Sequence, residues 1–108
     1  MSVDKGKRVP KLHAAYLQTW WPLAEANPNG RNGRDILGTP GVWFEDKTPQ
    51  AFRPAAFIAQ AAKGAATADE VPVVTYWPKG VWADIDKTIA MMPTPWLMRL
   101  LQEAKYTP

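Results

Sequence analysis

The chain has 108 residues, of which 46% are hydrophobic and 21% charged, so it has room for one domain with a single modest core. Its 13 Lys and Arg residues exceed its 10 Asp and Glu residues, and the net charge of +3 mildly favours a polyanionic partner. The absence of cysteine excludes disulfides and thiolate metal sites. No apolar run is long enough to cross a bilayer or to follow the charged N-terminus as a signal peptide would, so we expect an intracellular protein without membrane contact.

The N-terminal segment divides into an arm and a helix. Residues 1–9 are rich in basic side chains and are predicted to form a partly disordered arm ahead of a single domain over residues 10–108. Pro10 suits the first turn of a helix, and an apolar stripe continues from there to about Trp20.

Two short strands are predicted around the turn formers Gly38-Thr39-Pro40-Gly41. An extended piece at Glu25 and a turn-rich loop over residues 27–33 lead into them. We expect the strand Asp35-Ile36-Leu37 to pair antiparallel with the strand from Val42 to Lys47.

The C-terminal half continues the alternation of helices and strands. The sequence predicts an Ala-rich helix from Pro54 to Lys63 with Gly64 as its C-terminal cap, and a β-branched strand from Val71 to Trp77. A further strand at about Thr88 to Met91 and a helix from Thr94 to about Ala104 follow. This order predicts an α/β fold in which helices flank a mixed β-sheet.

Three charged side chains are expected to converge at the turn. Because strand side chains alternate between faces, Glu45 and Lys47 point the same way while Asp46 points the other. Antiparallel pairing would place Asp35 beside Glu45. Two carboxylates and a lysine at one point suit a hard divalent cation that holds a substrate phosphate.

The segment from Trp21 to Lys47 resembles the phage-encoded Holliday junction resolvase-like group of the PD-(D/E)XK nuclease superfamily. In that group an Asp precedes a Gly-x-Pro-Gly-like turn, which Glu-x-Lys follows; here these are Asp35, Gly38 to Gly41, and Glu45 to Lys47. The resemblance continues through a helix carrying Gln60 and covers nearly the whole chain.

The resemblance implies a restriction-endonuclease-like core and Mg²⁺- or Mn²⁺-dependent hydrolysis of DNA phosphodiesters. Asp35 and Glu45 would bind the cation together with the backbone carbonyl of Asp46. Lys47 would orient or deprotonate the attacking water or neutralise the transition state, and Gln60 would bond the water or a phosphate. Glu25 matches the position of a family Glu, and a role as a ligand and one as an ordinary surface carboxylate are equally open.

The expected partner is branched or junction DNA, bound by a homodimer because a four-way junction needs two incisions. As a phage protein, the chain would act in the cytoplasm of a bacterial host, in recombination or genome processing. Basic residues near the N-terminus, before Asp35 and in a later turn could neutralise DNA phosphates. These residues are Lys5, Lys7, Arg8, Lys11, Arg31, Arg34 and Lys79. A solvated tail explains the N-terminal residues equally well, whereas a charged turn is the less favoured explanation for Arg31 and Arg34.

One residue departs from the family pattern. Asp46 is charged where relatives carry an apolar residue facing the core, so either that face is wet or Asp46 has a basic partner. His13, the single histidine, is expected at the surface or at an interface.

The six tryptophans are expected mainly to fill the core. Trp20, Trp43 and Trp96 fall on apolar faces, and packing is also favoured over base stacking for Trp77 and Trp82.

Three function classes fit these observations. The first is a junction-resolving endonuclease, and the second is another nuclease of the superfamily, such as a nicking or mismatch enzyme or an RNase. The third is a non-catalytic nucleic-acid-binding protein, which the retained Asp35, Glu45 and Lys47 disfavour.

Overall fold

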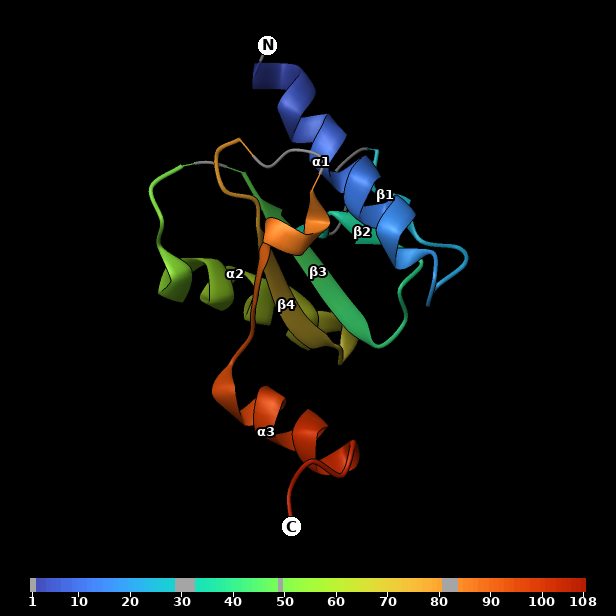
Figure 1. The fold of residues 1–108 in the computed structure, drawn as a ribbon, viewed down its shortest axis with the longest axis vertical. Coiled ribbons are helices and arrows are strands. Elements are labelled where there is room, and N and C mark those ends of the chain that lie inside the picture. Colours follow the sequence, from blue (N-terminus) through green and yellow to red (C-terminus); the bar gives the residue numbers. More distant parts are fainter. Residues whose placement is uncertain (1, 29–32, 49, 81–83) are drawn as a thin grey trace.

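The computed structural model describes residues 2–28, 33–48, 50–80 and 84–108, and of residues 2–7 it describes the backbone only (Figure 1). In chain order the elements are α1 (Ser2–Leu17), β1 (Glu25–Ala26), β2 (Ile36–Leu37), β3 (Val42–Lys47), α2 (Pro54–Ala68), β4 (Val71–Tyr76), the 3₁₀ helix η2 (Ile85–Lys87), β5 (Ile89–Met91) and α3 (Thr94–Glu103). The predicted α/β fold with a mixed sheet flanked by helices is confirmed.

The main sheet has the strand order β3-β4-β5. Strands β3 and β4 are parallel, with Val42 opposite Val71 and Lys47 opposite Tyr76, whereas β5 pairs antiparallel with β4. Parallel neighbours need a long crossover connection, which α2 supplies. Figure 1 shows β3 and β4 side by side, with α1 across one face of the sheet and α2 across the other.

Alternate residues of β3 enter two separate hydrophobic clusters. The cluster on the α2 side contains Trp43, Phe57, Ala61, Ala65 and Val74, and the cluster on the α1 side contains Ala14, Leu17, Ala24, Ile36 and Phe44. By the same alternation, Glu45 and Lys47 lie on the α2 side of the sheet and Asp46 on the α1 side, as predicted.

The predicted hairpin between β2 and β3 is wrong, because β2 pairs with a different strand. Strand β2 pairs antiparallel with β1, with Glu25 opposite Leu37, and a single backbone hydrogen bond from the Asp35 N–H to the Phe44 carbonyl (3.3 Å) joins this ribbon to β3. Gly38 shows why: it has φ +79°, and a Cβ there would lie 2.2 Å from the Leu23 carbonyl oxygen. The turn is therefore packed against the chain ahead of β1 instead of closing a simple hairpin.

Both long helices extend beyond their predicted limits. Helix α1 begins at Ser2 and contains Pro10, so the predicted arm has a helical backbone, and the fully buried Val9 ties it to the core. Helix α2 passes Gly64 and ends at Ala68, with Asp69 in the left-handed conformation as its cap. Gly64 instead allows α2 to pack closely on Trp43, because a Cβ at this position would lie 2.4 Å from the Trp43 ring.

The tryptophans divide between core and surface. Trp43 and Trp77 are buried, as expected, whereas Trp20 lies beyond the end of α1 and is 58% exposed. Trp96 is half-buried on α3, and Trp82 lies outside the described residues.

Candidate active site

The peptide of Asp46 connects the first predicted carboxylate to strand β3. The Asp46 N–H donates to Oδ2 of Asp35 over 2.7 Å. Carbonyls of Gly41 and Lys47 accept from β4, whereas the carbonyl of Phe44 accepts from Asp35 on the opposite edge. Since strand carbonyls alternate in direction, the Asp46 carbonyl points to the same edge as that of Phe44, toward Asp35.

The second predicted carboxylate is held by a neighbouring indole. Glu45 is 4% exposed, and its Oε1 accepts a hydrogen bond from Nε1 of Trp43 over 3.1 Å. Trp43 lies two residues earlier on the same face of β3, so one strand positions both groups. This role of Trp43 was not anticipated from its apolar character.

Asp35 and Glu45 interact with each other, and both resist ionisation. The pKa of Glu45 is raised to about 7, mainly by burial; the Asp35 carboxyl contributes to the rise, whereas the hydrogen bond from Trp43 and the charge of Lys47 oppose it. Burial also raises the pKa of Asp35, against the hydrogen bond from the Asp46 N–H and the charge of Lys47. Two carboxyl groups that share a desolvated site and repel each other when ionised form a place where a cation is favoured.

Lys47 reaches the same site from the next position on its face. Its Nζ donates to Oε1 of Gln60 over 2.7 Å and lies 5.3 Å from the ring centre of Phe57. Gln60 and Phe57 both belong to α2, so that helix sets the direction of the lysine. The structure therefore brings together the four predicted residues Asp35, Glu45, Lys47 and Gln60.

On the opposite face of β3, the side chain of Asp46 enters a buried polar cluster. Its Oδ1 accepts from Nδ1 of His13 over 2.7 Å and from Nε1 of Trp77 over 3.0 Å. Of the two alternatives for Asp46, a wet face or a basic partner, the structure shows the basic partner. The surface or interface position expected for His13 is wrong, because its side chain is buried within the chain and only 3% exposed. The helical spacing of Val9, His13 and Leu17, all buried, is the signal that could have placed the histidine in the core.

The basic residues predicted to contact DNA differ in whether their side chains are exposed or already paired within the protein. Arg34 is committed internally, because its guanidinium pairs with Glu70 and stacks 4.2 Å from the centre of the Trp43 ring. Arg8, Lys11 and Lys79 are exposed. Arg31 and the side chains of Lys5 and Lys7 lie outside the described part of the chain.

Glu25 does not join the cluster. It is exposed on β1, opposite Leu37, and no contact between its side chain and Asp35 or Glu45 is found, all three being described residues. Its role as a ligand thus has no support from the geometry.

The cluster provides oxygens suited to a hard cation. No group of three His, Cys, Asp or Glu side chains that could hold a metal occurs among the described residues. Two carboxyl groups and the carbonyl of Asp46 do share one edge, however, and Mg²⁺ typically takes few protein oxygens and keeps several waters. The residues present therefore fit Mg²⁺ or Mn²⁺.

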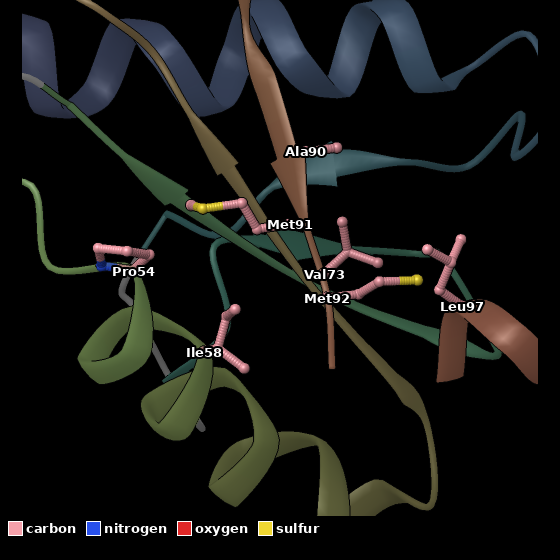
Figure 2. A pocket seen from close by; sticks show the side chains of 7 residues that line it. All are labelled: Pro54, Ile58, Val73, Ala90, Met91, Met92 and Leu97. Carbon is pink, nitrogen blue, oxygen red and sulfur yellow. The ribbon is translucent and has the colours of Figure 1, made fainter. Parts of the chain in front are cut away.

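A pocket of about 520 Å³ lies apart from the carboxylate cluster and is lined by other residues. Figure 2 shows Ile58 of α2, Met91 of β5, and Met92 and Leu97 around it. Its lining is apolar and includes none of the four clustered residues, so it does not suit a phosphate.

Comparison with known proteins identifies no relative. No family model matches the chain, and neither a curated protein nor a solved structure matches it. In the described residues, no helix is long and apolar enough to span a membrane.

Proposed function

We propose that this protein is a Mg²⁺- or Mn²⁺-dependent DNA endonuclease of the Holliday junction resolvase-like kind. One observation carries the proposal: the interacting, desolvated carboxyl groups of Asp35 and Glu45 lie beside the carbonyl of Asp46 and the ammonium of Lys47. A solvated surface hairpin would leave these groups apart, each with its ordinary pKa.

The residues divide the chemistry among themselves. Asp35 and Glu45 hold the cation, Trp43 fixes the orientation of Glu45, and the Asp46 N–H fixes that of Asp35. When bound, the cation lowers the pKa of the attacking water and offsets negative charge on the scissile phosphate. Lys47, oriented by Gln60, would place a positive charge where negative charge develops, or, as the neutral amine, would accept a proton from the water.

Exposed basic residues outside the cluster would contact flanking phosphates. Arg8 and Lys11 lie on α1, and Lys79 lies in the turn after β4. Arg34 is not included, because release of its guanidinium would leave Glu70 without its charged partner.

The assembly proposed for junction cleavage is a homodimer. One chain carries one carboxylate cluster, whereas symmetric resolution needs two incisions. Leu97, Met98 and Leu100 of α3 are exposed, and no residue of this helix, which the structure describes throughout, is buried. A helix that leaves several apolar side chains exposed in its own chain is consistent with a contact between chains.

The test is cleavage of labelled four-way junction, duplex and single-stranded DNA in Mg²⁺. We expect junction cleavage by the wild type and none by Asp35→Asn or Glu45→Gln, which remove one charge but keep the side-chain shape and the hydrogen-bond acceptor. Cleavage in excess EDTA, or cleavage by either variant at the wild-type rate, would contradict the metal-dependent reaction. Equal cleavage of duplex would favour a nicking nuclease, and binding without cleavage would favour a non-catalytic DNA-binding protein.

A further inference from the structure

Asp46 carries a charged side chain at a buried point of strand β3. The side chain is 2% exposed, and its Oδ1 accepts from both His13 and Trp77. Its Oδ2 is buried without a hydrogen-bond partner among the described residues. A buried carboxylate satisfied at one oxygen only is less stabilising than an apolar side chain of similar size, so folding alone does not account for it.

The backbone of the same residue faces the carboxylate cluster. Its N–H donates to Oδ2 of Asp35 over 2.7 Å, and its carbonyl points to the same edge of the strand. The side chain and the two flanking peptide groups of Asp46 are joined at one Cα, in a strand whose backbone is fixed by its pairing with β4. Any rotation of β3 that moved the buried carboxylate would therefore also move the N–H and the carbonyl at the site.

The two donors hold Asp46 from separate elements. His13 belongs to α1, and Trp77 follows the end of β4. The histidine ring is itself fixed by edge contacts with Phe44 (5.2 Å between ring centres) and with Trp77 (6.1 Å). The carboxylate is thus anchored at once to the helix in front of the sheet and to the neighbouring strand.

We propose that His13 and Trp77 are positioning residues for the site. By holding the Asp46 carboxylate, they fix the two peptide groups beside its Cα: one orients Asp35 through the Asp46 N–H, and the other presents the Asp46 carbonyl oxygen to the cation. This inference rests on the proposed function only for the cation; the orientation of Asp35 can be measured without it. Partners that orient metal ligands typically contribute about 10- to 100-fold in metal affinity.

The first measurement uses the metal-free, full-length chain. The ¹H–¹⁵N resonance of the Asp46 amide should lie downfield, because this N–H donates to a carboxylate. In His13→Leu we expect it to move upfield and to exchange faster with solvent. In His13→Asn, which keeps an N–H near the position of Nδ1, it should stay close to its wild-type position.

A control separates positioning from general stability. Leu17 is buried on the same helix, in the hydrophobic cluster with Ala14 and Phe44, and its apolar side chain offers no hydrogen bond to Asp46. Leu17→Ala should therefore lower the melting temperature without moving the Asp46 resonance. His13→Leu/Asp46→Val replaces the imidazole and the carboxylate by apolar side chains and leaves the buried Trp77 N–H without its acceptor. We expect this variant to melt no lower than Leu17→Ala.

The second measurement is Mn²⁺ binding followed by electron paramagnetic resonance. We expect His13→Leu and the double variant to bind Mn²⁺ about 10-fold more weakly than the wild type, and His13→Asn and Leu17→Ala to stay within about 3-fold. An unchanged Asp46 resonance in His13→Leu, together with unchanged Mn²⁺ affinity in His13→Leu and in the double variant, would overturn the proposal and leave the cluster a structural one. If the wild type binds no Mn²⁺ but His13→Leu still moves the Asp46 resonance, the proposed function fails while the positioning of Asp35 stands.

Discussion

At the scale of single residues, the site is shaped by what burial does to acidic groups. Glu45 is buried on the α2 side of the sheet, and this burial keeps it from ionising easily, although the hydrogen bond from the Trp43 indole favours the ionised form. Its pKa of about 7 means that near neutral pH the metal-free protein holds a proton that an exposed glutamate would have released. Binding of a cation would then displace this proton.

The raised pKa of Glu45 predicts a specific dependence of stability on pH. Between the ordinary pKa of 4.5 and the folded value of about 7, the folded state binds more protons than the unfolded state, so stability falls as the pH rises. Relative to Glu45→Gln, the wild type in EDTA should lose about 1–3 kcal/mol between pH 5 and pH 8 in urea denaturation. Mg²⁺ should restore much of this loss in the wild type only.

Glu25→Gln is the matched control, since Glu25 is exposed on β1 and should leave the pH dependence as in the wild type. A wild-type stability that rises over this range relative to Glu45→Gln would show that Glu45 is ionised and stabilising in the folded state.

A second prediction at this scale concerns Lys47. Lys47→Ala should slow cleavage by about 100-fold or more, because its ammonium lies at the carboxylate cluster. DNA affinity, measured in Ca²⁺ to prevent cleavage, should fall by less than about 3-fold, since one phosphate contact among several is a small share of binding. Lys63→Ala, at an exposed lysine of α2, should match the binding change without the loss of rate. Equal losses of rate and affinity in Lys47→Ala would make Lys47 part of a general basic surface.

At the scale of elements, the contact between α2 and β3 determines where Trp43 can lie. Replacing a glycine inside a helix with alanine normally stabilises the folded state by about 1 kcal/mol. At Gly64 the added Cβ would instead lie 2.4 Å from the Trp43 ring, so Gly64→Ala should destabilise the fold by about 1–3 kcal/mol. Because Trp43 holds Glu45, cleavage should slow as well.

Urea denaturation would measure the change at Gly64. Ala59→Gly, at an exposed position of the same helix, should show the ordinary cost of about 1 kcal/mol for a helical glycine. A more stable Gly64→Ala would mean that the helix and Trp43 are not in close contact.

The sequence predicted the order of elements well, because hydrophobic periodicity and turn formers are local signals. The strands over Val42 to Lys47 and Val71 to Tyr76, and the helix from Thr94, lie almost where expected. The predictions of where α2 ends and of which strand pairs with β2 were wrong, because each feature depends on a contact between residues distant in sequence. These contacts are Gly64 with Trp43 and Gly38 with Leu23. A local pattern cannot distinguish a capping glycine from one that makes room for a ring.

The candidate site was also predictable only in part, because some of its contacts follow from local patterns and others join residues distant in sequence. Asp35, Glu45 and Lys47 followed from a motif and strand alternation, and the structure brings them together. The contact of His13 with Asp46 joins residues 33 positions apart, so only the need of a buried acid for a partner pointed to it.

At the scale of the whole molecule, the chain has two different surfaces to explain. One is the strand edge with the carboxylate cluster, and the other is the apolar surface of α3, which Figure 1 shows extending beyond the end of the sheet toward the C-terminus. The pocket of about 520 Å³ adjoins this second surface through Met92 and Leu97. A chain with a modest core rarely leaves so many apolar side chains of one helix exposed without a function for them.

We therefore predict that the protein is a homodimer that contacts its partner through α3. Light scattering at micromolar concentration should give twice the 12.0 kDa mass of the chain. Leu97 is 44% exposed and borders the pocket, so Leu97→Glu should convert the dimer to a monomer by placing a charge in an apolar contact. Gln102→Glu adds the same charge at another exposed position of α3 and should leave the dimer intact. A monomer for the wild type, with and without junction DNA, would favour a nicking nuclease and leave the metal chemistry unchanged, because each chain carries its own Asp35, Glu45 and Lys47.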